Sequence, residues 1–271
     1  MTNFVKRTLS GILFVAIIIS SIMFNQYTFA VVFAVISGFT IHEFHKLTNN
    51  LVEINVNTWL GIGGGLFLFL SSYLFVSGIL SHIVFAVYGL FIVLSLVYEL
   101  FRKKNNPIHN WAYFILAQTF IALPFALLNF IIFIDNYQPI LLLSVFVTIW
   151  VNDTGAYLVG VTFGKHRLFE RISPKKSWEG FVGGACFALL SGYIFSLFIP
   201  EISLLNWLIL SEIVVVFGTF GDLIESLIKR TVHVKDSGNI IPGHGGLLDR
   251  FDSMLLAAPV VFIYLSIIFS K

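Results

Sequence analysis

Five charged side chains late in the sequence have the spacing of a cation and phosphate site. Asp222, Glu225 and Lys229 stand three and four residues apart, so in a helix they would share one face. Asp249 and Asp252 repeat the three-residue spacing. Two carboxylate pairs on two helices could converge on a hard cation such as Mg2+, which takes oxygen ligands and commonly uses one or two carboxylates with phosphate oxygens. We therefore expect metal chemistry here.

The segment between the two acidic pairs is suited to binding phosphate. Positive charge is supplied in and beside it by Lys229, Arg230, Lys235 and Arg250. The segment is also rich in residues that exclude a helix and let backbone N–H groups approach an anion: Gly238, Pro242, Gly243, Gly245 and Gly246. His244 is a further candidate for a phosphate contact. Alternatively, these acids and bases only neutralise one another at a solvated membrane edge. An acid in a membrane helix costs about 2.5–3.5 kcal/mol, which favours a functional Asp222.

A second group of polar residues lies between positions 150 and 180. Asp153 interrupts an apolar run, and Glu179 opens the next one. Ser173 is expected to cap a segment that begins at the following proline, with Lys175 and Lys176 near its N-terminal end, where a triphosphate could bind. The two lysines could equally reflect only the basic bias of cytoplasmic loops.

The composition places these residues in a membrane protein. Of the 271 residues, 58% are hydrophobic and 11% are charged, whereas soluble domains carry about 25% charged residues. The protein has no basic face of the kind that nucleic acid binding requires. One cysteine excludes an internal disulfide and a zinc site with several Cys ligands. Residues 42–45, His-Glu-Phe-His, lack the spacing of zinc proteases.

Apolar runs predict an all-α, polytopic fold with about nine transmembrane helices, because each needs about 20 apolar residues. The expected spans are 9–24, 27–44, 59–76, 79–100, 111–134, 139–160, 178–199, 204–227 and 253–269. All of the 16 Lys and Arg residues except Lys271 then fall on the side of the N-terminus. That side is therefore predicted to be cytoplasmic. We expect one membrane-embedded domain, 1–271, with a hydrophobic scaffold half, 1–140, and a catalytic half, 141–271.

Two segments together resemble the phosphatidate cytidylyltransferase (CDP-diacylglycerol synthase) family. Its signature is matched at Ser226, Lys229, Arg230, Lys235, Asp236, Pro242, His244, Gly245, Gly246, Asp249, Arg250 and Asp252. Residues 153–157 and 173–180 match as well, with Ser177 where threonine is common. The first half of the chain matches only in its hydrophobic layout.

The resemblance implies that CTP and phosphatidic acid react to CDP-diacylglycerol and pyrophosphate at the cytoplasmic face of the cell membrane. It implies Mg2+, with room for a second cation, and a homodimer. The implied metal ligands are Asp222 and Asp249, with Asp252 nearby. The implied catalytic residues are Asp222, Lys229, Arg230, Lys235, Asp236, Asp249 and Asp252. The implied substrate contacts are Asp153, Ser173, Lys175, Lys176, Glu179, His244, Gly245, Gly246 and Arg250.

Two other functions remain open from the sequence. The protein could use CTP to activate another lipid phosphate, such as an isoprenoid ether lipid phosphate, because no residue pattern indicates which lipid tail is bound. A cation-coupled transporter would also explain acids within spans, but its charged groups should lie near the bilayer midplane with access from both sides. A lipid-binding scaffold without activity is disfavoured because every charged position of the signature is filled.

Overall fold

The predicted apolar runs form long helices in the part of the chain that the structure, a computed structural model, describes: residues 3–270. The first half contains α1 (Asn3–Phe24), α2 (Gln26–Thr48), α3 (Thr58–Val76), α4 (Ile83–Phe101), α5 (Pro107–Ala117), the π-helical turn η1 (Gln118–Ala122) and α6 (Leu123–Ile132). The second half contains α7 (Pro139–Phe163), strands β1 (Arg167–Phe169) and β2 (Ser173–Ser177), α8 (Trp178–Ser196), α9 (Leu204–Thr231) and α10 (Leu248–Phe269). Within residues 3–270, 9 helices are long and apolar enough to cross a membrane, which confirms the all-α polytopic fold.

The two helices that carry the acidic pairs are longer than predicted. Helix α9 continues to Thr231 and α10 begins at Leu248, whereas the apolar runs predicted an end at 227 and a start at 253. The prediction cut the helices at charged side chains, but hydrogen bonding along the backbone continues through them. Asp249 and Asp252 therefore lie in the first turns of α10.

A widened turn separates α5 from α6 within one continuous span. Pro124 follows the π-helical turn and has no N–H to offer the carbonyl of Phe120. The side chain of Gln118 bridges neighbouring helices here: its Nε2 donates to Gly61 O at 3.0 Å, and its Oε1 accepts from Tyr88 Oη at 3.1 Å. The polar side chain at this turn therefore has hydrogen-bond partners in α3 and α4.

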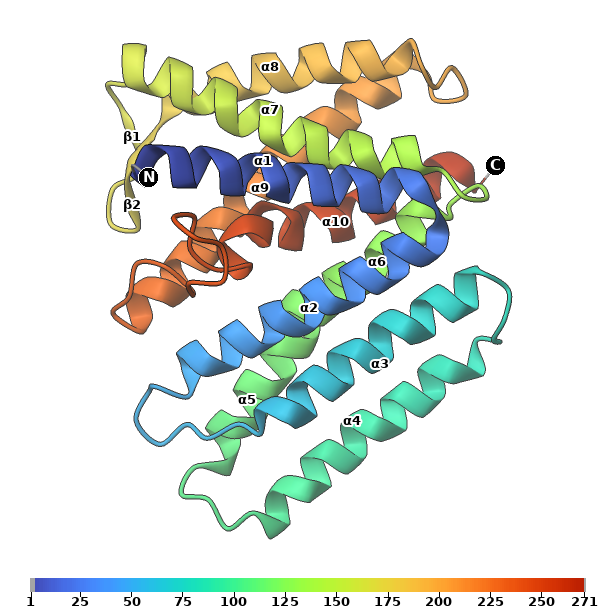
Figure 1. The fold of residues 1–271 in the computed structure, drawn as a ribbon, viewed down its shortest axis with the longest axis vertical. Helices are drawn as coiled ribbons and strands as arrows, with labels where there is room; N and C mark the ends of the chain where they lie inside the picture. Colours follow the sequence, from blue (N-terminus) through green and yellow to red (C-terminus); the bar gives the residue numbers. More distant parts are fainter. Residues whose placement is uncertain (1–2, 271) are drawn as a thin grey trace.

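The helices form two groups that meet along α1, α6 and α10. Helix α7 packs along α8, and α9 packs along both α8 and α10, while α3 packs against both α2 and α6 on the other side. Figure 1 shows the N-terminal end of α1, the β1–β2 hairpin and the loop between α9 and α10 at one end of the helices, with the C-terminus at the opposite end. The polar segments predicted to carry chemistry thus share one end of the bundle.

An aromatic side chain at the start of α10 joins the two groups. Phe251 is 1% exposed. Its ring lies 5.7 Å from Phe14 of α1, 6.3 Å from Phe33 of α2, 5.3 Å from Phe125 of α6 and 6.1 Å from Phe146 of α7, measured between ring centroids. Aromatic pairs at such separations stabilise beyond their area burial. Phe251 thereby fixes the helix turn that bears Asp249 and Asp252.

The segment before α8 is a strand, so the expectation that Ser173 caps a helical segment is wrong. Strands β1 and β2 pair antiparallel, with Phe169 opposite Ser173. The N-cap of α8 is Ser177, whose Oγ accepts from Gly180 N at 3.1 Å. Ser177 is the hydroxyl nearest the true helix start, which explains why a serine serves there as well as threonine.

Candidate active site

Three carboxylates from two helices converge near the basic end of the bundle. Asp222 and Glu225 of α9 and Asp252 of α10 each offer one oxygen, and these oxygens lie within 4.8 Å of one another. Glu225 is fully buried, and its Oε1 has no hydrogen-bond partner among the described residues. Carboxylates gathered this closely repel one another unless a cation lies between them. The acid cluster, Asp222, Glu225 and Asp252, has the oxygen ligands that a divalent cation takes.

Glycine lets the two helices approach closely enough to form this cluster. A Cβ atom at Gly221 would overlap the main-chain oxygen of Asp252, and one at Gly218 would touch Ser253. The α10 backbone therefore lies directly against α9, one residue before Asp222. Any larger side chain at Gly221 would push Asp252 away from the other two acids.

A buried lysine lies beside the acid cluster. Lys229 Nζ is 2.6 Å from Glu225 Oε2 and 2.6 Å from Asp249 Oδ1. Lys229 stands one helical turn after Glu225, as the spacing predicted. Its positive charge offsets part of the negative charge of the cluster, and its three donors hold α9 to the first turn of α10.

Asp249, in the first turn of α10, anchors the loop between α9 and α10. Its Oδ1 accepts from Lys229, while its Oδ2 accepts from Ser237 N at 2.9 Å, Ser237 Oγ at 2.9 Å and Gly246 N at 2.8 Å. The structure thus gathers two of the three predicted metal ligands, Asp222 and Asp252, with Glu225. It places Asp249 beside them, where both of its oxygens already have partners.

Glu43 of α2 is a site residue that the sequence analysis missed. It is 2% exposed. Its Oε2 accepts from Leu248 N at 2.9 Å and from Ser237 Oγ at 3.3 Å. A carboxylate at the N-terminus of α10 satisfies an otherwise unpaired N–H and opposes the helix dipole. The sequence does carry a signal for Glu43, because an acid within an apolar span is costly. The sequence analysis considers residues 42–45 only as a zinc-binding motif.

The loop is tied to α1 as well. Ser10 Oγ donates to Pro242 O at 2.9 Å and shares a hydrogen bond of 2.8 Å with His244 Nδ1. Arg250 Nη2 donates to His244 O at 2.8 Å. Burial, and then the positive charges of Arg250 and Arg7, lower the pKa of His244 below its usual value, so the ring is neutral at pH 7. His244 is therefore a hydrogen-bonding group at the edge of the site.

Two cavities meet at the acid cluster. One, of about 630 Å³, has apolar side chains in its wall together with polar and charged ones, which include Asn152, Asp153, Arg167, Lys175, Lys176 and Asp222. The other, of about 460 Å³, has apolar lining from Phe14, Val15, Ile149 and Trp150 and polar lining from Asp153, Asp222, His244, Asp249, Arg250 and Asp252. Both cavities share Asp153, Asp222 and Ser253. An anionic ligand and an amphipathic one could meet there.

The lysine pair predicted from the sequence reaches the site. Lys176 Nζ lies 2.5 Å from Asp222 Oδ2, and Lys175 lines the same cavity. Asp153 stands on α7, across the cavity from the hairpin, and accepts a long hydrogen bond of 3.5 Å from Asn152 Nδ2. The hairpin between α7 and α8 thus brings basic side chains to the acid cluster.

Other predicted residues lie outside these cavities. Glu179 Oε2 accepts from Lys165 N at 3.0 Å, and its Oε1 is 2.6 Å from His166 Nδ1, so it holds the turn before β1. Arg230 Nη1 donates to Val234 O at 3.1 Å. Lys235 and Asp236 are exposed on the loop. Their positions near a bound substrate stay predictions. Gly245, with φ of 85°, and Gly246 make the tight turn before α10.

The chain is similar to known proteins along almost its whole length. The sequence model of the cytidylyltransferase family matches residues 5–268. The phosphatidate cytidylyltransferase of Bacillus subtilis is 33% identical over 98% of this chain and 99% of its own length. That of Haemophilus influenzae is 34% identical over 94% and 96%. That of Staphylococcus saprophyticus is 47% identical over 46% of this chain and 48% of its own. The chain belongs to the cytidylyltransferase family.

Proposed function

We propose that the protein transfers the cytidylyl group of CTP to phosphatidic acid, giving CDP-diacylglycerol and pyrophosphate. The observation that carries this proposal is the acid cluster where two cavities meet, one of which is lined by three basic side chains. The names of the relatives support the same substrates. Each cavity has both charged and apolar side chains in its wall, as sites for a nucleotide and a lipid phosphate require.

The acid cluster fits a divalent cation, and we propose Mg2+. Asp222, Glu225 and Asp252 would hold it, and the unpartnered Glu225 Oε1 is the oxygen most in need of a cation. When bound, the cation would neutralise charge on the phosphate oxygens of the nucleotide. Asp249 would act from beside the cluster, through Lys229 and the loop.

The basic residues would position the two anionic substrates. The cavity of about 630 Å³ is lined by Arg167, Lys175 and Lys176, whose positive charges suit a triphosphate. Arg250 lines the other cavity and suits the phosphate of the lipid. A phosphatidate oxygen would attack the α-phosphorus of CTP, the bond to the β-phosphate would break, and pyrophosphate would leave. The attacking oxygen is already anionic at neutral pH, so no side chain needs to remove a proton. Catalysis would rest on positioning and charge.

The position of the acids favours this reaction over cation-coupled transport. Asp222 and Glu225 lie in the last third of α9, and Asp252 lies in the first turns of α10. Both helix segments belong to the same end of the bundle (Figure 1). A transporter would place its coupling acids near the midplane, with access from both sides.

The orientation and the oligomeric state are further parts of the proposal. The one-sided distribution of lysine and arginine supports a cytoplasmic N-terminus and a site that opens to the cytoplasm. The resemblance to the family supports a homodimer. Labelling of cysteines introduced at either end of the bundle in intact cells tests the orientation, and the mass of the detergent-solubilised protein tests the dimer.

The reaction itself is tested with purified protein, labelled CTP, phosphatidic acid and Mg2+. We expect lipid-extractable label and pyrophosphate in equal amounts, and loss of both when a chelator removes the metal. Glu225→Gln should abolish the product. Glu212→Gln is the matched control, because Glu212 is another glutamate of α9 outside both cavities, and it should retain activity.

Phosphatidic acid should be compared with other lipid phosphates in the same assay. Equal turnover of an isoprenoid lipid phosphate would widen the substrate class. Folded wild-type protein that gives no product with any lipid phosphate would overturn the proposal.

A further inference from the structure

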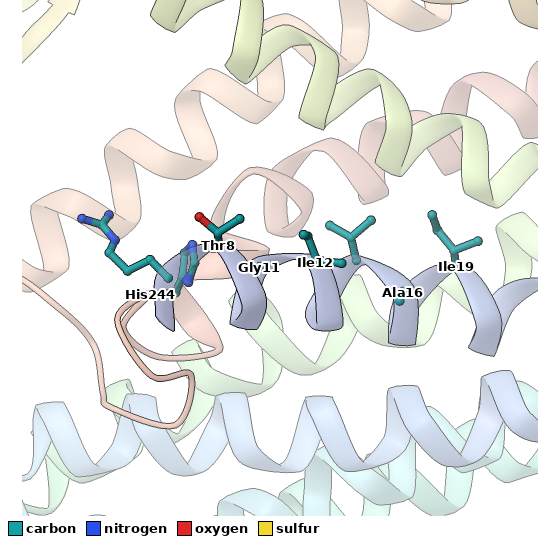
Figure 2. A pocket seen from close by; sticks show the side chains of 8 residues that line it. Thr8, Gly11, Ile12, Ala16, Ile19 and His244 are labelled. Atoms are coloured by element: carbon teal, nitrogen blue, oxygen red, sulfur yellow. The ribbon is translucent and has the colours of Figure 1, made fainter. Parts of the chain in front are cut away.

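A groove runs along α1 on the outside of the catalytic end. Its volume is about 920 Å³, and its apolar lining comes from Ile12, Val15, Ala16 and Ile19. Figure 2 shows the labelled side chains of this groove following α1 from Thr8 to Ile19, with His244 at one end. Thr8 and Ile19 are eleven positions apart, which corresponds to about 16 Å along a helix. We call this feature the α1 groove.

An apolar helix face is ordinary in a bilayer, but the α1 groove has a cationic end. Arg7 and His244 line that end. Beyond His244, Arg250 lines the neighbouring cavity and donates to His244 O at 2.8 and 3.1 Å. The Arg7 side chain packs against Gly243, where an added Cβ atom would overlap it. The groove therefore combines about two turns of apolar wall with the guanidinium group of Arg7, a group that binds phosphate well.

The α1 groove adjoins the catalytic cavity. Gly11, Val15 and His244 line both the groove and the cavity of about 460 Å³ that contains Asp222 and Asp252. The His244 ring packs against Gly11 at this boundary: a Cβ atom on Gly11 would lie 3.3 Å from His244 Cε1. Any side chain at position 11 would therefore press on the ring that separates the lipid-facing surface of α1 from the catalytic cavity.

We propose that the α1 groove binds an acyl chain of the lipid phosphate substrate, and that its phosphate reaches the acid cluster past the contact between Gly11 and His244. This inference rests on the proposed function and adds the route of the lipid. The occupant is a lipid phosphate because the cationic end matches a phosphate, the apolar wall matches an acyl chain, and the groove shares Gly11, Val15 and His244 with the cavity that holds the reacting groups. An acyl chain lying along α1 would also run parallel to the acyl chains of the surrounding lipids. The lipid would therefore enter the groove without changing its orientation.

A bulky residue at Gly11 tests this route. Gly11→Leu should raise the KM for phosphatidic acid about tenfold or more, the loss expected when about 1.4 kcal/mol of binding is removed. The KM for CTP should stay within about twofold of the wild-type value, because the proposed nucleotide site is the cavity of about 630 Å³ and Gly11 does not line it. Gly63→Leu is the matched control, since Gly63 is an exposed helical glycine of α3 with nothing within 4 Å of an added Cβ. An unchanged KM for phosphatidic acid, or equal changes in both KM values, would overturn the proposal.

Protection from labelling tests the groove without catalysis and with less disruptive changes. Cys186 is the one cysteine, so Cys186→Ser provides a background for Ile12→Cys, Ile19→Cys and a control on α4, Val93→Cys. Phosphatidic acid should slow maleimide labelling at positions 12 and 19 several-fold, while diacylglycerol, which lacks the phosphate, should not. The control position should be insensitive to both.

These outcomes separate the groove from the proposed reaction. Protection in the absence of CTP supports the groove whether or not the nucleotide is CTP. Equal protection by phosphatidic acid and diacylglycerol would show an unspecific lipid surface. A disulfide formed between two copies through Ile12→Cys would show a dimer contact. Either result would overturn the groove proposal and leave the proposed reaction untouched.

Discussion

Two groups of polar residues lie within the helices, and they differ in how far their hydrogen bonds are satisfied. At the end of α4, Glu99 Oε2 is 2.9 Å from Arg102 Nη1 and its Oε1 accepts from Asn110 Nδ2 at 2.6 Å. Arg102 Nη2 donates to Asn55 Oδ1 at 2.6 Å, and Asn110 Oδ1 accepts from Asn55 N at 2.7 Å. Each charged group of this Glu99 network has partners, and the network joins α4, α5 and the loop before α3.

The acid cluster of α9 and α10 is different. Its three carboxylates lie close to one another, with Lys176 and Lys229 beside them. Asp222 lines both cavities and Asp252 lines one of them. Glu225 Oε1 is buried without a hydrogen-bond partner among the described residues. A satisfied network stabilises the fold, whereas like charges held together beside a cavity cost stability and are retained for a ligand. Glu212 Oε1 also lacks a hydrogen-bond partner among the described residues, so the gathering of like charges beside a cavity, and not a missing partner alone, assigns the acid cluster to chemistry.

The largest expected effect is that of a substitution at Asp252, which should lower activity without lowering stability. Asp252→Asn keeps the size of the side chain but removes one ligand charge from the acid cluster. We expect kcat/KM to fall about 1,000-fold, because losing a metal ligand removes roughly 4 kcal/mol of transition-state stabilisation. Thermal stability without metal should stay equal or rise, since one repelling charge is gone. Stability and activity falling together would contradict the assignment.

Glu43→Gln tests whether the scaffold helix α2 controls the site. The variant weakens the bonds to Leu248 N and Ser237 Oγ, so the loop and the start of α10 would be held less firmly. We expect kcat to fall about 10- to 100-fold, as for residues that orient metal ligands, with little change in the KM for CTP. Glu43→Asp should rescue part of kcat if its carboxylate still reaches Leu248 N. Loss confined to KM would exclude a positioning role.

Sequence reasoning reached the helices and the spacing of the acids because both depend on neighbours along the chain. Apolar runs predicted the nine spans, and the three- and four-residue spacings placed Asp222, Glu225 and Lys229 on one face, where the Lys229–Glu225 pair is found. The same spacing could not tell which carboxylates converge between helices. Glu225 joins the acid cluster and Asp249 turns toward the loop because of how α9 packs on α10 at Gly221.

Contacts between distant parts of the chain could not be predicted from the sequence. Glu43 and Ser237 are separated by 194 positions, and Ser10 and His244 by 234. No local pattern encodes these pairs, since they follow from α1 and α2 packing beside the start of α10. The β1–β2 hairpin was missed for a related reason: its lysines and serines are also common in loops, and pairing between the two strands supplies the structure.

A smaller effect is expected in the satisfied network. Glu99→Gln leaves Arg102 without its carboxylate partner, so we expect a loss of about 1–3 kcal/mol in stability, as for other buried hydrogen bonds to charged groups. The measurement is the melting temperature in detergent, with Glu53→Gln, an exposed glutamate of the same loop region, as the control. The kcat of Glu99→Gln should match that of the wild type at a temperature where both are folded. If Glu99→Gln lowered kcat without lowering the melting temperature, the Glu99 network would have a catalytic role and the distinction between the two groups would be wrong.

The smallest expected effect is a pH dependence from His244, which lies outside both groups. Its pKa is lowered in the folded protein by burial and by the charges of Arg250 and Arg7, so the unfolded chain binds more protons as the pH falls through the ordinary histidine value of about 6.5. Stability should therefore fall slightly from pH 7 toward pH 5 and stay level above pH 7. His244→Gln removes the titrating group and should flatten this part of the profile, measured as melting temperature against pH relative to wild type. If the wild-type profile rises toward pH 5 and the variant abolishes the rise, the ring is stabilised by protonation, and the hydrogen bond with Ser10 would then join a charged ring to α1.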